Sequence, residues 1–234
     1  MNQSLTAQEL HALRQIDTCL VANAIETFDL RLRNEGYAFS TIHSVFPKLP
    51  PMVGYAAPIK IRCSDPPTDA SLYPDRTDWW NYVRTIPAPR VVVIQDADET
   101  PGAGALIGEV HANILRALGC VGAVTNGAVR DLPALEAMGF PVFAGSATVS
   151  HAYVHIIEFG QPVEVGGLTI RAGDLVHGDC HGVLSIPNQI ATQIPAVADK
   201  IRQQEERIIA LCRSHDFSIE KLRQAVSEEP RGER

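Results

Sequence analysis

A strand, a helix and a second strand follow one another in the middle of the chain, and this order restricts the fold more than any other feature. Residues 90–98 (RVVVIQDAD) contain the apolar run typical of a buried parallel strand. Residues 105–119 (ALIGEVHANILRALG) have the spacing of an amphipathic helix that ends at Gly119, and residues 122–126 (GAVTN) predict the second strand. Together they predict a βαβ unit, and therefore a parallel sheet covered by helices.

The segments before this unit predict helix and then short strands. In residues 5–35, apolar side chains recur at three- and four-residue spacing, which predicts a helical beginning. Residues 46–75 contain many prolines between short β-branched stretches, a pattern typical of strands separated by loops.

The segments after the unit continue the α/β alternation. Residues 131–139 predict a short helix that ends at Gly139, and residues 141–146 predict a third strand. Two-residue alternation and glycine turns between residues 153 and 187 predict antiparallel hairpins. The stretch 188–227 predicts a C-terminal helix with an apolar face made of Ile201, Ile208, Ile209 and Cys212. No internal repeat or charged linker divides the sequence, so we expect a single domain over residues 1–234.

The composition excludes several classes of protein. A hydrophobic content of 45% excludes a disordered chain. The 20 basic and 27 acidic residues give a net charge of −7 without a basic cluster, so no nucleic-acid partner is expected. The longest apolar runs, such as Val91–Ile94, are far shorter than the ~20 residues of a membrane span, and the first residues lack the pattern of an export signal.

The cysteines indicate a reducing environment. They are odd in number, widely spaced and without a CxxC pair: Cys19, Cys63, Cys120, Cys180 and Cys212. This pattern predicts neither a zinc motif nor a disulfide framework, and a cytoplasmic location fits it best.

Two strand-to-helix junctions are candidate ligand sites. The carboxyl ends of parallel strands collect ligands there, because helix N-termini offer free N–H groups. The first junction, Gly102–Glu109, lacks the GxGxxG spacing of a dinucleotide site, so a tight turn is the favoured interpretation. The second, Asn126–Asp131, ends in Arg130-Asp131, which could grip a carboxylate and hold a hard divalent metal. A helix-capping Asp131 beside a surface arginine is an equally good interpretation of the local sequence. Together the two junctions could bracket one pocket.

Histidines and aromatic residues give weaker signals. His177, Asp179 and His181 alternate as they would on one face of a strand, and His151 and His155 lie upstream. A His/Asp/His metal site is conceivable, but histidines of this kind more often satisfy core hydrogen bonds or line a loop. His111 and His181 are candidate pocket residues for substrate preference or proton transfer. The cluster Trp79, Trp80 and Tyr82 is explained most simply by packing or a subunit contact.

Longer motifs connect these residues to a known family. They are GE at 108–109, G-x-x-G-A-V-T-N-G-A-V-R-D at 119–131, F-P-V-F-A at 140–144, and V-G-G-L-T-I-R-A-G-D-L-V-H-G-D-C-H-G-V-L-S-I-P at 165–187. With these motifs the chain resembles the RraA-like family, which contains the RNase E activity regulator and the metal-dependent 4-hydroxy-4-methyl-2-oxoglutarate/4-carboxy-4-hydroxy-2-oxoadipate aldolases. The resemblance implies an α/β fold, the swivelling β/β/α domain of RraA-like type, with N-terminal helices and a long C-terminal helix.

One spacing places the chain nearer to the aldolases. In those members an acidic residue is followed by twenty intervening residues and then Arg-Asp, and here Glu109 precedes Arg130-Asp131 with that separation. The regulator branch typically has a non-acidic residue at the position of Asp131. Two departures bear on substrate choice: Glu109 replaces the usual aspartate, and Ala134 stands where many aldolases carry another acid.

The resemblance also implies a role for each site residue. Asp131 would bind Mg²⁺ or Mn²⁺ directly and Glu109 would hold metal-bound water, while Gly108 and the backbone amides of Val110 and His111 would receive the substrate carboxylate. Arg130 would contact the keto oxygen of a 2-oxo acid, where charge develops as a pyruvate enolate forms. Retro-aldol cleavage and oxaloacetate decarboxylation share this enolate, so one carbon–carbon lyase site could perform both.

Assembly and alternatives complete the expectations. The family forms homotrimers or homohexamers in which the C-terminal helix of a neighbouring subunit brings an acid to the site. The matching residue here is Glu205, with Glu206 adjacent, and a solvated helix charge is as good an interpretation of either. The rival function is a non-catalytic regulator that binds an RNase or another protein. A third is another lyase or hydratase that acts on a related hydroxy acid.

Overall fold

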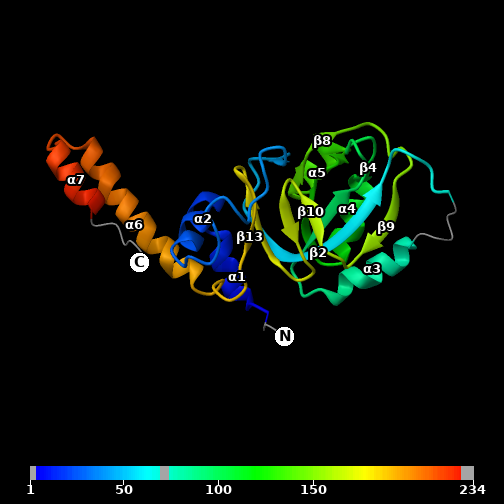
Figure 1. Ribbon diagram of the computed structural model, residues 1–234, viewed down its shortest axis with the longest axis horizontal. Helices are drawn as coiled ribbons and strands as arrows, with labels where there is room; N and C mark the ends of the chain where they lie inside the picture. Colours follow the sequence, from blue (N-terminus) through cyan, green and yellow to red (C-terminus); the bar gives the residue numbers. More distant parts are fainter. Residues whose placement is uncertain (1–3, 69–73, 228–234) are drawn as a thin grey trace.

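The main sheet of the protein contains eight strands and curves into a nearly closed, barrel-like layer (Figure 1). The computed structural model describes residues 4–68 and 74–227. The sheet has the order β1-β7-β5-β3-β2-β12-β13, with β9 also paired to β2. Its strands are β1 (His43–Ser44), β2 (Met52–Arg62), β3 (Arg90–Asp96), β5 (Cys120–Thr125), β7 (Val142–Ala144), β9 (His155–Phe159), β12 (Leu175–Asp179) and β13 (Gly182–Ile186). The α/β fold expected from the sequence is confirmed.

The predicted βαβ unit forms the centre of this sheet. Strands β3 and β5 pair in parallel, and helix α4 (Glu109–Ala117) connects them. Gly119 follows the helix with a φ of 78°, a conformation that glycine adopts without strain. The prediction of helix from residue 105 is wrong, however, because Ala105–Ile107 form strand β4. All three residues are buried, and Ala105 and Ile107 pair with a neighbouring strand, so tertiary pairing overrides their helical spacing.

Strand β4 belongs to a second, three-stranded sheet. It has the order β4-β6-β8 and is parallel throughout, with β6 at Ala128–Val129 and β8 at Ser146–Ala147. Helix α5 (Leu132–Ala137) follows β6 and ends before Gly139, which has a φ of 61°. The short helix and its glycine stop are therefore confirmed. The third strand predicted at 141–146 divides into β7 of the main sheet and β8 of this one.

The proline-rich segment contains one long strand instead of several short ones. Strand β2 covers eleven residues and continues through Pro58. On one side, β12 pairs with residues 52–55 of β2 and β9 pairs with residues 59–62. The Ala56 N–H points to this side, where it donates to the Asp174 carbonyl, and alternation turns the nitrogen of Pro58 the same way. Pro58 thus lies between two partner strands, where its missing N–H costs no ladder bond.

The helical beginning is divided into two helices. Helix α1 (Ala7–Arg14) starts with a Thr6–Glu9 capping box, and helix α2 (Thr18–Glu26) starts at Asp17, whose carboxylate accepts the Leu20 N–H. An aspartate that caps a new helix competes with continuation of the previous one, which explains why one helix over residues 5–35 does not form.

His177 and Asp179 fasten these helices to the sheet. The His177 ring is buried; its Nε2 lies 3.2 Å from the Leu13 carbonyl and 3.1 Å from the Ile16 carbonyl, and its Nδ1 accepts from the Thr18 hydroxyl. The Asp179 carboxylate accepts the Thr18 N–H at 2.8 Å. The two side chains share a face of β12, as predicted, and His177 satisfies buried backbone groups instead of standing free to bind a metal. His181 lies in the following turn, outside the strand.

Helix α3 (Arg76–Thr85) and two hairpins complete the body. Trp79 is fully buried and Tyr82 stacks on Phe159 with ring centroids 5.2 Å apart, so the aromatic cluster has the packing role expected of it. The predicted antiparallel hairpins are β10–β11 (Val163–Val165 and Leu168–Ile170) and β12–β13.

The C-terminal segment is two helices that extend away from the barrel (Figure 1). Helix α6 (Ile194–Arg213) packs on α2 only along its first part, where Ile194 and Ala198 are buried. Helix α7 (Ile219–Ser227) folds back on α6 and buries none of its residues. The predicted apolar face is only partly buried. Ile201 packs against the core and Ile208 is half-buried, whereas Ile209 and Cys212 are exposed. No helix in residues 4–68 and 74–227 has the length and hydropathy that crossing a membrane requires.

We expect His177→Ala to lower the free energy of unfolding by about 2–4 kcal/mol, because it leaves a cavity and two buried carbonyls without a donor. Burial lowers the pKa of His177 below its usual 6.5. The unfolded chain therefore takes up this proton at a higher pH than the folded one, and the stabilisation is complete above pH 6.5 and declines as the pH falls. Urea unfolding at pH 7.5 and pH 5.5 tests both points.

His215→Ala, a change at an exposed position between α6 and α7, is the control. It should leave both the free energy of unfolding and its pH dependence unchanged. An equal pH dependence in the wild type and in His177→Ala would refute the buried neutral state of His177.

Candidate functional site

The two predicted junctions meet across strands β4 and β6. The strands pair in parallel, Ala105 with Ala128 and Ile107 with Val129, and the Arg130 N–H donates to the Ile107 carbonyl at 3.0 Å. Gly108 and Glu109 therefore lie beside Arg130 and Asp131. Glu109 and Asp131, which are 22 positions apart in the sequence, come together because both strands end at the same edge of the small sheet.

Asp131 has an unusual backbone conformation. Its φ of 56° and ψ of 38° are left-handed, a conformation that costs an ordinary residue about 1–2 kcal/mol and that aspartate tolerates better than most. Although Asp131 precedes α5, its carboxylate makes no capping bond to that helix. It crosses to α4 instead, where Oδ2 accepts the Glu109 N–H at 3.1 Å. Asp131 therefore occupies the N-cap position of α5, as the capping interpretation expects, but its side chain does not cap that helix.

Gly108 permits this approach. A Cβ atom at residue 108 would lie 2.5 Å from Asp131 Oδ2 and 3.0 Å from Arg130 Cγ. Any side chain at this position would displace the carboxylate, so the absence of one is a geometric requirement of the site.

Arg130 and a histidine complete the charged group. Arg130 Nε lies 3.3 Å from Asp131 Oδ1, and the far end of the guanidinium donates to His151 Nδ1 at 3.2 Å. The Glu109 amide, together with Arg130 and His151, lowers the pKa of Asp131 below its usual 3.8. Asp131 is therefore an ionised carboxylate at neutral pH, with 36% of its side chain exposed. Sequence reasoning noted His151 but assigned it no role, because nothing in the spacing links it to Arg130.

The first turn of α4 provides N–H groups for an anion. The first hydrogen bond within the helix runs from Ala112 N–H to the Gly108 carbonyl. The amides of Val110 and His111 precede it, and such first-turn amides have no acceptor inside a helix. The Val110 side chain is 70% exposed and Glu109 is exposed, so this end of the helix faces solvent. Free amides and the positive end of the helix dipole favour a bound carboxylate here.

The His111 side chain points inward, behind this turn. It is only 8% exposed, packs with its ring centroid 6.5 Å from that of Trp79, and leaves Nε2 without a protein partner among the described residues. Burial, with smaller electrostatic contributions from Arg76 and His151, lowers the pKa of His111 to about 4. Its imidazole is therefore neutral at physiological pH, and its ring is not part of the exposed surface beside Asp131.

The first junction, Gly102–Glu109, begins with a tight turn, which is the interpretation that the sequence favours. The Gly102 N–H donates to Asp96 Oδ2 at 2.8 Å, and a Cβ at Gly104 would lie 2.3 Å from the His151 carbonyl. The turn belongs to a group that sequence reasoning did not find, in which ligand atoms of Cys63, Asp96 and Asp98 lie within 4.8 Å of one another. These residues follow or end β2 and β3, so only the parallel pairing of those strands reveals the group.

Glu205 and Glu206 lie outside this arrangement. Both are exposed on α6, which extends from the side of the barrel that carries α1 and α2, whereas α4 and α5 lie on the other side (Figure 1). Neither acid approaches Asp131 of its own chain. His155, on β9, has its Nδ1 at 2.8 Å from the Tyr153 carbonyl and lies in the sheet next to β2.

We expect Asp131→Asn to fold normally and to lose only about 0.5–1 kcal/mol of unfolding free energy. Asparagine tolerates the left-handed conformation and can still accept the Glu109 N–H, so mainly the favourable charge at the start of α4 disappears. Urea unfolding at low and at high salt measures the loss, which salt should reduce. A loss above about 2 kcal/mol at either salt would instead assign Asp131 a mainly structural role.

Known proteins are similar to this chain in sequence and in fold. The profile of the RraA-like family (Aldolase/RraA) matches residues 18–185. A protein of Halalkalibacterium halodurans, provisionally named a 4-hydroxy-4-methyl-2-oxoglutarate aldolase, is 30% identical over 125 residues, which make up 53% of this chain and 53% of that relative. This chain thus spans about half the length of the curated relative.

Two crystal structures share the fold. An uncharacterized protein from Pseudomonas syringae pv. tomato has a TM-score of 0.74 at 23% identity, with 97% of this chain and 96% of that one covered. Streptomyces coelicolor RraAS2, described as an unusual member of the RNase ES inhibitor RraA protein family, has a TM-score of 0.67 at 20% identity, with 87% and 96% covered. Because the family profile spans more than half of the sequence and the fold agrees, the chain belongs to the RraA-like family.

Proposed function

We propose that this protein is a divalent-metal-dependent carbon–carbon lyase that cleaves or decarboxylates a small 2-oxo dicarboxylic acid to pyruvate. The observation that carries the proposal is the juxtaposition of an ionised carboxylate, a guanidinium and the free first-turn amides of α4 at one solvent-facing edge. The provisional aldolase name of the 30% identical relative supports the same reaction class.

The donor set suits Mg²⁺ or Mn²⁺. These ions prefer carboxylate oxygens and keep several waters, and Asp131 offers an ionised, partly exposed carboxylate with lone pairs left after its two hydrogen bonds. Asp131 would hold the metal directly, and the exposed carboxylate of Glu109 would hold its water. When bound, the metal supplies positive charge that favours enolate formation from the 2-oxo acid.

The protein groups would position the substrate. Its carboxylate would bind the amides of Val110 and His111, at the open end of α4 beside Gly108. The Arg130 guanidinium would donate to the keto oxygen, and its hydrogen bond to His151 restricts its direction. Because negative charge grows on that oxygen as the carbon–carbon bond breaks, a fixed guanidinium stabilises the transition state more than the ground state.

An isolated chain leaves this site open, and a neighbouring subunit would close it. Val110, Glu109 and Asp131 all contact solvent, whereas an enolate must be shielded from stray protonation. The same chain carries an arm, α6 and α7, with exposed apolar side chains at Ile209, Phe217, Ile219 and Val226. Twenty residues of helix extend about 30 Å, so this arm can reach another copy. We therefore propose a homotrimer or homohexamer with Glu205 supplied in trans.

We expect Asp131→Asn to reduce metal-dependent pyruvate release by on the order of 10²–10³-fold, because the ionised ligand is lost while the fold is kept. Release from oxaloacetate and from 4-hydroxy-4-methyl-2-oxoglutarate is measured with Mg²⁺ or Mn²⁺ and again with EDTA, through coupling to lactate dehydrogenase. Asp216→Asn, an exposed aspartate in the segment between α6 and α7, is the matched control and should keep full activity.

Unchanged metal-dependent pyruvate release in Asp131→Asn would refute the assignment of the lyase site to Asp131. If neither compound yields pyruvate above the enzyme-free blank, the lyase assignment to these substrates fails. A stoichiometric RNase recovered by pull-down would then support the regulatory function, and another hydroxy acid would be the remaining substrate class.

We expect Glu205→Gln to lower kcat by about 10–100-fold, as loss of an outer carboxylate at a metal site commonly does, and Glu206→Gln to leave kcat unchanged. Mixed oligomers sharpen the test, because Glu205→Gln subunits keep Asp131 and Asp131→Asn subunits keep Glu205. If Glu205 acts in trans, refolding the two impaired variants together yields more activity than either variant alone. Absence of this gain in oligomers shown to be mixed would refute a shared site.

A further inference from the structure

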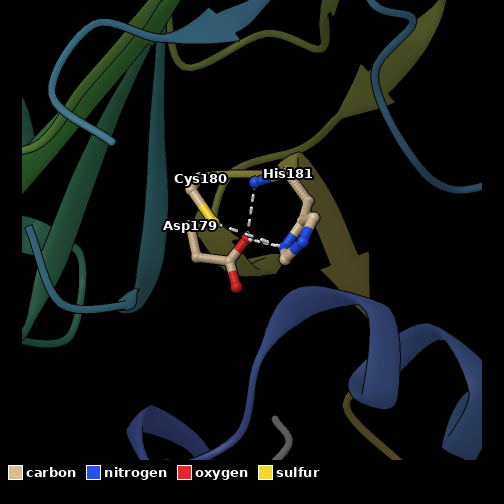
Figure 2. A group of neighbouring side chains, drawn as sticks. All are labelled: Asp179, Cys180 and His181. Carbon is tan, nitrogen blue, oxygen red and sulfur yellow. Dashed lines mark hydrogen bonds and ion pairs between the residues drawn. The ribbon is translucent and has the colours of Figure 1, made fainter. Parts of the chain in front are cut away.

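Three side chains of types that can hold a metal ion lie at the turn between β12 and β13, beside α2 and away from Asp131. Among the described residues, Asp179, Cys180 and His181 have ligand atoms within 4.8 Å of one another. Figure 2 shows the thiol and the imidazole converging on the Asp179 carboxylate. Cys180 Sγ lies 3.5 Å from His181 Nδ1, and His181 Nδ1 lies 3.1 Å from Asp179 Oδ1.

The turn holds these groups in place. Asp179 is buried, with Oδ2 accepting the Thr18 N–H at 2.8 Å and Oδ1 accepting the His181 N–H at 2.8 Å. Asp179 also pairs with Gly182, which closes the turn with a φ of 133°. The carboxylate and the backbone of the turn are therefore fixed, and only the exposed Cys180 thiol and His181 ring can rotate.

We propose that Asp179, Cys180 and His181 form a Zn²⁺ site in this turn. Two ligands at the tetrahedral angle around zinc, with bonds of about 2.3 Å to sulfur and about 2.0 Å to nitrogen, lie about 3.5 Å apart. The Cys180–His181 separation equals this value without rearrangement. A thiolate with an imidazole selects zinc over magnesium or calcium, so the site differs in chemistry from the one at Asp131.

The bonds in the empty turn are compatible with binding. Asp179 Oδ1 can keep the His181 N–H on one lone pair and bind zinc with another. His181 would bind through Nδ1 as the neutral imidazole, with its proton on Nε2, and the Cys180 thiol would release its proton to solvent. The ring is 52% exposed, so Nε2–H can be hydrated.

The group at Cys63 is a weaker candidate for the same ion. Asp98 Oδ2 already accepts three donors, from the backbone of Cys63 and from both the backbone and the hydroxyl of Ser64. Burial raises the pKa of Cys63 to about 12, so this thiol resists the ionisation that zinc requires.

Co²⁺, a spectroscopic substitute for zinc, tests the proposal on the full chain carrying Asp131→Asn. We expect one equivalent of Co²⁺ to produce a thiolate-to-cobalt charge-transfer band that Zn²⁺ abolishes and excess Mg²⁺ does not. Cys180→Ser should eliminate the band, and His181→Ala should weaken Co²⁺ binding at least about tenfold. Cys212→Ser, which removes an exposed thiol on α6, is the matched control and should keep the band.

Three results would overturn the proposal: no band in the parent protein, a band that persists in Cys180→Ser, or a band lost in Cys212→Ser. Because Cys180 and His181 are exposed, their replacement should leave the melting temperature without metal unchanged. Zn²⁺ should raise that temperature in the parent and not in Cys180→Ser. The proposal does not depend on the lyase assignment, since Asp131 is replaced throughout.

Discussion

The hydrogen bond from the Glu109 N–H to the Asp131 carboxylate is the contact on which the candidate site depends. It joins the start of α4 to the end of β6, so it exists only because β4 and β6 pair in parallel. It requires a left-handed aspartate and a glycine at 108, two features that each carry a conformational cost. In return, it keeps Asp131 ionised beside Arg130 and leaves the next amides of α4 free for an anion.

Strand β12 of the main sheet carries similar residue types that serve a different purpose. There His177 and Asp179 satisfy backbone groups of α1 and α2 and fix these helices to β12. The residues on β12 and those of the candidate site differ in burial. His177 has no exposed surface and remains neutral, whereas Asp131 is partly exposed and charged. The C-terminal arm is anchored to the same two helices, because α6 packs on α2 and α1.

Sequence patterns correctly predicted the elements that depend on interactions between residues close in the sequence. The buried strand at 90–98, the glycine stops at 119 and 139 and the hairpins follow from periodicity and turn chemistry, and all are present. The same patterns gave wrong predictions for residues whose conformation depends on pairing between distant segments. Ala105–Ile107 fit a helix but pair with β6, and Pro58 suggested a break but lies between two partner strands. The apolar face of α6 is buried at Ile194 and Ala198 and exposed at Ile209, a difference that periodicity cannot reveal.

The sequence by itself determined the α/β class, the family resemblance and the residue types at the candidate site, because these depend on spacing and on the motifs around Glu109 and Arg130-Asp131. Only the tertiary structure decided which groups meet: His151 with Arg130, Asp131 with the first amide of α4, and Cys180 with His181 and Asp179. The physical reason is that side-chain contacts across strands depend on register and on one or two backbone angles, such as those of Asp131, that spacing along the chain does not encode.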